Sequence, residues 1–250
     1  MLKVRIIPCL DCRDGRVVKG IRFQGLRDAG HPGERAAAYE AQGADELVLL
    51  DVSATVEGRK TQVETVRQVR EALSIPLTVG GGVHSIDSAG RLLDAGADKV
   101  SVNTAAVRDP SLISEIATRF GSQCAVLAID AAAAGDGWEV VVMSGAERTG
   151  KNVIDWAREA VHRGAGEILL TSWDRDGTRS GYDLKLLHAI STAVTVPVIA
   201  SGGAAHPEHL LEAIRSGADA VLAASIFHDG EWTVEAVKSW LGEQGVEVRR

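Results

Sequence analysis

The stretch IPLTVGGGVHSIDSAGRLLDAGADKVSVNT, residues 75–104, decides the fold. A β-branched run, PLTVGG (76–81), is followed by the amphipathic segment SIDSAGRLLDAG (85–96) and a second apolar run, KVSVN (99–103). Short β-branched runs are typical of buried strands, and apolar residues at helical spacing between them indicate a helix. This stretch therefore predicts a strand–helix–strand unit with parallel strands.

The same pattern recurs from one end of the chain to the other. Apolar runs predict eight strands, at residues 4–10, 46–52, 76–81, 99–103, 124–130, 167–172, 197–201 and 220–225. Amphipathic segments between them predict helices, among others at 34–43, 65–73, 85–96 and 207–217. No Pro- or Ser-rich linker divides the series, so we expect an α/β protein in which residues 1–250 form a single (β/α)8 TIM barrel.

The chain also repeats itself at a shift of 121 residues. GADELVLL (43–50) matches GAGEILLT (164–171), and residues 75–104 match residues 196–225. A shift of 119 residues places Asp11 over Asp130. Strand–helix units resemble one another in any barrel, but several blocks in register favour two similar half-barrels, about residues 1–120 and 121–250.

Composition restricts the class of protein. Apolar residues make up 45% and charged residues 24%, which is ordinary for a globular domain. No apolar run is long enough for a membrane span, and the first residues do not resemble a signal peptide. Three cysteines fit a reducing compartment, so we expect a cytoplasmic protein. A net charge of −7 argues against nucleic-acid binding but allows a small anionic ligand.

Two acids end predicted strands at corresponding places. Asp11 and Asp130 each follow an apolar run, and barrel active sites lie at the carboxyl ends of the strands. Two carboxylates on opposite strands could act as general acid and general base. The alternative is that each carboxylate caps the loop that follows it, but their symmetric placement favours catalysis.

Glycine-rich segments follow strands in both halves. VGGGV (79–83) and ASGGA (200–204) each lie between a strand and a helix, where backbone N–H groups can approach an anion. Thr104 and Ser225 add hydroxyls at equivalent positions. One such loop could be a tight turn, whereas two pairs indicate a ligand with a phosphate at each end.

Cys9 and Cys12 resemble a C-x-x-C motif but have the wrong setting for one. Three residues apart on a strand, they point to opposite faces and cannot share a metal ion. Redox motifs of this spacing lie at a helix N-terminus, whereas here a loop with an Asp-Gly turn is expected to follow the strand. We therefore expect Asp11, between the two cysteines, to carry the function, with no metal ion and no cofactor.

Charged residues near strand beginnings form a further pattern. Arg5, Glu46, Lys99 and Glu167 each lie an even number of residues from an inward-facing position on the same strand. They would form a ring of ion pairs inside the barrel, which is unusual because barrel interiors are mostly apolar. The alternative is that they point outward into water.

Several motifs together resemble a known family. RIIPCLDCRDGRVVKG, TVGGGV, GADKVSVNTAAV, GAGEILLTSWDRDGTRSGYD and AASIFH are similar to the cyclase subunit of imidazole glycerol phosphate synthase, over residues 3 to about 228. The resemblance implies that ammonia and a doubly phosphorylated ribulosyl aminoimidazole carboxamide nucleotide give imidazole glycerol phosphate and aminoimidazole carboxamide ribotide. It also implies a separate glutaminase subunit that docks at the N-terminal face of the barrel and supplies ammonia through its interior.

The same resemblance assigns roles to individual residues. The catalytic pair falls on Asp11 and Asp130, and the ammonia gate on the four charged residues near the strand beginnings. Substrate and phosphate contacts fall on Lys19, expected on a long loop after the first strand, and on Gly82, Asn103, Thr104, Asp176, Gly177, Gly203, Ala224 and Ser225.

Three other functions stay open on the sequence. The sister isomerase of the same pathway has a similar barrel, although CLD (9–11) and SGYD (180–183) favour the cyclase. A related barrel could pass ammonia to another acceptor in a surface-sugar pathway. A non-catalytic scaffold for an amidotransferase is the third alternative, and the intact acid pair argues against it.

Overall fold

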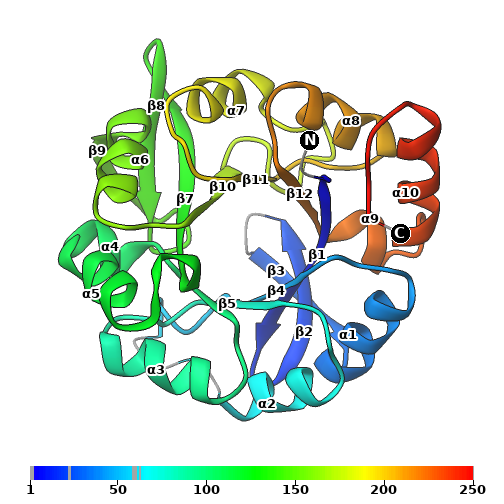
Figure 1. Cartoon of the computed structure of the whole chain (residues 1–250), viewed down its shortest axis with the longest axis horizontal. Coiled ribbons are helices and arrows are strands. Elements are labelled where there is room, and N and C mark those ends of the chain that lie inside the picture. Colours follow the sequence, from blue (N-terminus) through cyan, green and yellow to red (C-terminus); the bar gives the residue numbers. More distant parts are fainter. Residues whose placement is uncertain (1–2, 22–23, 58–60, 62, 250) are drawn as a thin grey trace.

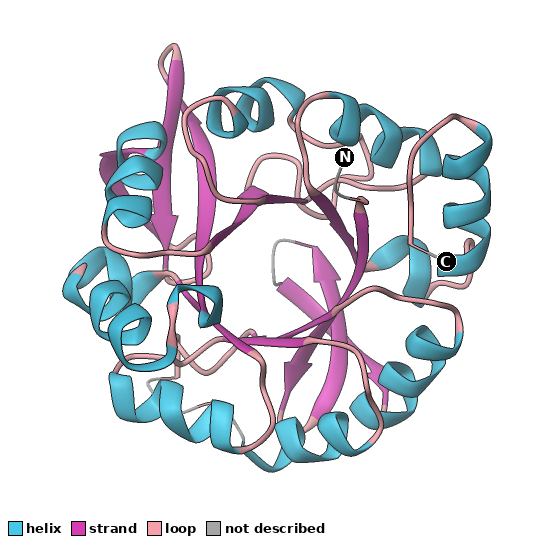
Figure 2. Cartoon of the chain, viewed as in Figure 1, coloured by secondary structure: helices cyan, strands magenta, loops and turns pink. Residues whose placement is uncertain are grey.

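The computed structural model describes residues 3–21, 24–57, 61 and 63–249, without the side chains of residues 19–27. Its centre is a closed barrel of parallel strands surrounded by helices, as Figures 1 and 2 show. In circular order the eight barrel strands are β1 (Arg5–Arg13), β4 (Leu47–Asp51), β5 (Leu77–Gly80), β6 (Lys99–Val102), β7 (Ala125–Ala134), β10 (Glu167–Ser172), β11 (Val198–Ser201) and β12 (Ala220–Ala223). The predicted TIM barrel and its eight strands are confirmed.

Helices cover the outside of the barrel (Figure 2). They are α1 (Pro32–Ala41), α2 (Val63–Glu71), α3 (Ile86–Asp94), α4 (Thr104–Arg108), α5 (Ser111–Phe120), α6 (Val153–His162), α7 (Leu184–Ser191), α8 (Pro207–Arg215), α9 (Ser225–His228) and α10 (Val234–Glu243), with a 3-10 turn η1 (Ser122–Cys124). Glycines that follow α1, α3, α6 and α8 have positive φ angles, between 83° and 108°, which end a helix without steric strain.

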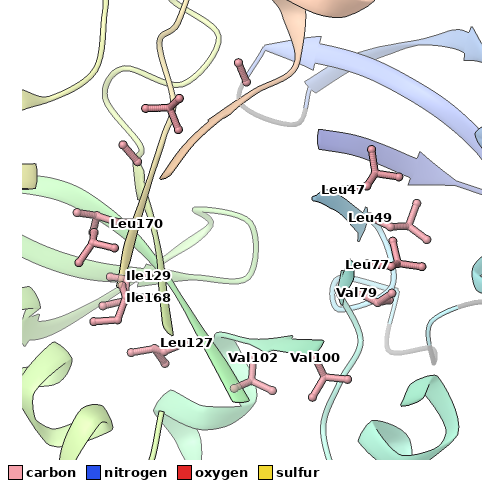
Figure 3. Packing of buried hydrophobic residues seen from close by; sticks show 14 of the residues in the cluster. Leu47, Leu49, Leu77, Val79, Val100, Val102, Leu127, Ile129, Ile168 and Leu170 are labelled. Carbon is pink, nitrogen blue, oxygen red and sulfur yellow. The ribbon is translucent and has the colours of Figure 1, made fainter. Parts of the chain in front are cut away.

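Alternating side chains divide the apolar core into two layers. Leu47 and Leu49 of β4 belong to the cluster between barrel and helices, whereas Val48 belongs to the cluster inside the barrel. Figure 3 shows the outer layer on β4, β5, β6, β7 and β10. Because neighbouring residues of a strand point to opposite faces, the inward positions are left for a smaller interior cluster and for polar side chains at both ends.

Two antiparallel ribbons extend the barrel at corresponding places. β1 continues into β2 (Arg16–Ile21) and β3 (Gln24–Gly30), and β7 continues into β8 (Gly137–Val142) and β9 (Glu147–Asn152). The predicted Asp-Gly turn joins β1 to β2, with φ angles of 51° at Asp14 and 73° at Gly15. The expectation that Lys19 lies on a long loop is wrong, because this turn pairs the following residues as strand β2, which contains Lys19.

The two halves share details beyond their strand order. The side chain of Asp98 accepts a hydrogen bond from the backbone N–H of Leu77 at 2.8 Å, and Asp219 does the same for Val198 at 2.9 Å. Each pair is related to the other by the shift of 121 residues seen in the sequence. These parallels support the division into half-barrels at about residue 120, which stays a prediction.

Candidate functional site

A cavity of about 550 Å³ opens at the carboxyl ends of the barrel strands. We call this end the mouth and the opposite end, where the barrel strands begin, the floor. Of the residues expected to contact substrate or catalyse the reaction, those lining the cavity are Asp11, Gly82, Asn103, Thr104, Asp130, Asp176, Gly177, Gly203, Ala224 and Ser225. Lys19 is the exception, and its side chain lies outside the part of the chain that the structure describes.

The two candidate catalytic acids lie on opposite walls of the mouth. Asp11 is on β1 and Asp130 on β7, and three strands separate β1 from β7 in either direction around the barrel. Each acid lies close to the point where its strand leaves the barrel to form a ribbon: Asp130 pairs with Thr171 of β10 and with Val141 of β8. The ribbons therefore continue the wall above each acid.

Withdrawal from water makes both carboxyl groups weak acids, although each side chain is only half-buried at the cavity wall. Withdrawal from water and, second, the negative charge of Asp176 raise the pKa of Asp11 to about 7. The same two causes raise the pKa of Asp130 to about 7. Groups with such pKa values exist in both protonation states near neutral pH, which is the property that a general acid or base needs.

Each acid accepts a hydrogen bond from a different kind of donor. The amide nitrogen of Asn103 donates to Asp130 at 3.0 Å, and the thiol of Cys9 donates to Asp11 at 3.5 Å. Both bonds favour the charged carboxylate and so partly oppose the effect of burial on its pKa. Asn103, which the sequence predicts to contact phosphate, is thus a hydrogen-bond donor to the carboxylate of Asp130.

The two glycine-rich regions lie on either side of the acid pair in the circular strand order. Gly82 and Thr104 follow β5 and β6, whereas Gly203 and Ser225 follow β11 and β12. A side chain at Gly203, whose φ is 99°, would collide with the carbonyl oxygen of Gly181. This position therefore keeps bare backbone next to the cavity.

In the glycine-rich region that follows β5 and β6, some polar groups have hydrogen-bond partners within the chain. The N–H of Gly82 donates to the Thr55 hydroxyl at 3.1 Å, and the Thr104 hydroxyl accepts from the N–H of Met143 at 3.1 Å. Met143 follows β8, so the ribbon above Asp130 also fixes the position of Thr104.

The four charged residues at the floor point inward and pair with one another. Arg5 contacts Glu46 at 2.9 Å and Glu167 at 2.5 Å. Lys99 contacts the same two carboxylates at 2.9 and 2.7 Å, which closes a ring of alternating charge. Thr78 donates a further hydrogen bond to Glu46 at 2.7 Å. The alternative that these side chains point outward is wrong for all four.

Sequence reasoning missed some residues of the cavity. It dismissed Cys9 because the C-x-x-C spacing fits neither a metal nor a redox site, although Cys9 lies two residues before Asp11 on the same strand face. It also missed Arg179 and His228, which line the cavity. Arg179 is ion-paired with Glu231 at 2.5 Å. An inward position next to an expected catalytic residue was the available signal for Cys9.

Among residues 3–21, 24–57, 61 and 63–249, no group of three or more His, Cys, Asp or Glu side chains is arranged to hold a metal ion. Within the same ranges, no helix has the length and apolar character needed to cross a membrane.

Comparison with known proteins agrees with the motifs and the barrel. The family model described as "Histidine biosynthesis protein" matches residues 5–233. The chain belongs to this histidine biosynthesis family. The resemblance inferred from the sequence motifs is confirmed.

Relatives within the family match over nearly their whole length. A protein of Gluconacetobacter diazotrophicus is 57% identical over 250 residues, covering 100% of this chain and 97% of that protein. One of Bacillus pumilus is 58% identical over 252 residues, with both chains covered completely. One of Metallosphaera sedula is 56% identical over 246 residues, covering 98% of each. All three are named "Imidazole glycerol phosphate synthase subunit HisF".

Proposed function

We propose that this protein is the cyclase subunit of imidazole glycerol phosphate synthase. The observation that carries the proposal is the pair of carboxyl groups of Asp11 and Asp130, each with a pKa of about 7, on opposite walls of one cavity. The names of the full-length relatives support the same activity.

The substrate would lie across the mouth with one phosphate in each glycine-rich region. Gly82, Asn103 and Thr104 would face one phosphate, and Gly177, Gly203 and Ser225 the other. Backbone N–H groups are neutral and can bind anions without adding positive charge. A protein with a net charge of −7 can therefore bind a doubly phosphorylated nucleotide through local contacts.

The chemistry that we propose is proton transfer by two acids. Ammonia adds to the ketose carbonyl of the substrate and water is lost. The added nitrogen then closes the imidazole ring by bonding to the carbon that links the two parts of the substrate. The bond from that carbon to the aminoimidazole carboxamide portion breaks at the same stage, which releases aminoimidazole carboxamide ribotide. One of the two aspartates removes a proton from the attacking nitrogen, and the other donates a proton to the leaving nitrogen. Ammonia, the ketose nucleotide and the three products balance without an oxidant or a cofactor.

The floor has a separate proposed role. A glutaminase subunit would dock at the N-terminal face, and ammonia would enter the barrel through the ring formed by Arg5, Glu46, Lys99 and Glu167. The ring is closed by four ion pairs, so passage requires at least one pair to open. Turnover driven by glutamine in the assembled synthase should respond to Arg5→Ala more than turnover driven by ammonium salts.

The decisive experiment uses the purified chain without a partner. We expect the ketose nucleotide and ammonium at alkaline pH to yield imidazole glycerol phosphate and aminoimidazole carboxamide ribotide in equal amounts. Isomerisation of the corresponding aldose without ammonia would instead indicate the sister isomerase. An absence of turnover by the wild-type chain, with the substrate shown to bind, would indicate a scaffold.

A further inference from the structure

Cys9 lies directly below Asp11 on the inner face of β1. Its side chain is 3% exposed and belongs to the apolar cluster inside the barrel, together with Ile7 and Val48. The Sγ atom is 3.5 Å from Oδ1 of Asp11, a normal distance for a hydrogen bond donated by sulfur. A buried thiol thus contacts one of the two proposed catalytic groups.

The thiol at this position stays protonated. Burial, and next the negative charge of Asp11, raise the pKa of Cys9 well above its ordinary value. A thiol that keeps its proton is a poor nucleophile and a poor metal ligand, but it remains a hydrogen-bond donor. The chemistry open to Cys9 is therefore donation to the carboxylate next to it.

The second half of the barrel lacks this arrangement. The residue two positions before Asp130 is Ala128, which has no donor. Asp130 instead accepts its hydrogen bond from Asn103, at the end of the neighbouring strand β6. Each acid thus has a donor that contacts it directly, although the two donors come from different places in the half-barrel.

We propose that Cys9 is a positioning residue, which holds the carboxylate of Asp11 in its catalytic orientation by donating the thiol hydrogen bond. The proposal rests on the proposed cyclase function, because it assigns Asp11 to proton transfer. Because the thiol of Cys9 holds Oδ1 of Asp11, the carboxylate keeps its orientation before substrate binds. The same bond favours the charged carboxylate and keeps the pKa of Asp11 below the value that burial alone would give.

The test compares Cys9→Ala, which removes the donor, with Cys9→Ser, which replaces it by a stronger one. The activity measured is ammonium-driven turnover across pH, with the concentration of free ammonia held constant. We expect Cys9→Ala to lower kcat about fivefold, as for loss of one modest hydrogen bond, with KM unchanged. The pH limb that reports Asp11 should move to higher pH in Cys9→Ala.

Cys9→Ser should recover most of the lost kcat and move the same limb to lower pH than in Cys9→Ala. Cys12→Ala is the matched control, because Cys12 is also buried and adjacent to Asp11 but points into the outer apolar layer. We expect Cys12→Ala to leave the pH profile unchanged. If Cys9→Ala does not fold, Cys9→Ser still tests the proposal, since it retains side-chain volume and must shift the limb relative to wild type.

A readout independent of turnover separates this proposal from the proposed function. Carbon-13 NMR of labelled aspartate gives the pKa of Asp11 in the folded protein, with Asp11→Asn identifying its signal. A higher pKa in Cys9→Ala supports the positioning role even if the cyclase assay fails. An unchanged pKa, together with a wild-type pH profile, would overturn it.

Discussion

The floor and the mouth of this barrel both place ionisable side chains inside the barrel, but those side chains have different partners. At the floor, two carboxylates and two cations form a closed ring. Within it, the carboxylate of Glu46 accepts hydrogen bonds from Arg5, Lys99 and Thr78. At the mouth, withdrawal from water and, second, the negative charge of a third carboxylate, Asp176, raise the pKa values of Asp11 and Asp130. Mutual pairing closes the ring at the floor, whereas withdrawal from water and a neighbouring like charge bring the pKa values of the acids at the mouth into the range that favours proton exchange.

This difference has a consequence for stability. A buried ion pair with both partners present costs the folded state little. Removing one partner leaves the other charge buried and uncompensated, which is strongly destabilising. The half-buried carboxylates at the mouth are partly desolvated, which destabilises the folded state when they are charged. Substitutions at the floor should therefore affect mainly stability, and those at the mouth mainly activity.

The largest effect is expected from Asp11→Asn and Asp130→Asn. Each keeps the side-chain volume and removes one of the two groups able to exchange a proton, so kcat with ammonium should fall about 10²–10⁴-fold. Thermal unfolding at pH 8 should occur at the wild-type temperature or above it, because a partly desolvated negative charge is gone. Asp28→Asn, at an exposed carboxylate paired with Arg16, is the control and should retain full activity. Retained activity in either mouth variant would remove that acid from the mechanism.

Glu46→Gln tests the floor from the other side. Glu46 is 2% exposed, and its neutral replacement leaves Arg5 and Lys99 with Glu167 as their remaining partner in the ring. We expect the free energy of unfolding, measured with denaturant, to fall by about 3 kcal/mol. Ammonium-driven kcat should stay within about twofold of wild type, since the acids at the mouth are untouched.

An exposed ion pair provides the matched control for that measurement. Arg16→Ala, which breaks the exposed pair with Asp28, should lower the unfolding free energy far less than Glu46→Gln does, because water and salt screen a surface pair. Equal losses in Glu46→Gln and Arg16→Ala would show that burial of the ring adds nothing, and the contrast between floor and mouth would fail.

The pH dependence of stability gives a third comparison. The pKa values of Asp11 and Asp130 are about 7 in the folded protein and about 4 in an unfolded chain. The folded state therefore binds more protons between these values, and both acids contribute stability that is present below pH 4 and lost as pH rises through 7. In the double variant Asp11→Asn with Asp130→Asn, the free energy of unfolding should decline less between pH 4 and 7 than in wild type. Identical slopes would mean that the two carboxyl groups are not withdrawn from water in the folded protein.

Local patterns predicted the barrel and the positions of its charges well, because both depend on alternation along single strands. Arg5 and Asp11 lie on one face of β1 at an even spacing, and that face could be identified from the sequence. The ribbons were harder. ERTGKN, which forms β9, is polar along its whole length and has no alternation to mark it as a strand.

Contacts between strands could not be predicted from the sequence. The bond from Asn103 to Asp130 joins β7 to the residue that follows β6, and it depends on strand register and side-chain rotamers. The hydrogen bond from Cys9 to Asp11 lies within one strand, yet it was not predicted, because the C-x-x-C spacing is typical of metal and redox sites rather than of a hydrogen-bond donor. In both cases the position of a catalytic carboxylate could be predicted from the sequence more readily than the residue that donates a hydrogen bond to it.

The smallest expected effect comes from Ala128→Ser, which gives the second half of the barrel a donor at the position equivalent to Cys9. Ala128 borders the cavity, so an added hydroxyl has room. A second donor should favour the charged form of Asp130 and move its pH limb to lower pH, with kcat within about twofold of wild type. The measurement is the pH profile of ammonium-driven turnover at constant free ammonia. A limb that does not move would show that Asn103 alone fixes Asp130, whereas a shift would show that the acids at the mouth are incompletely paired, unlike the charges at the floor.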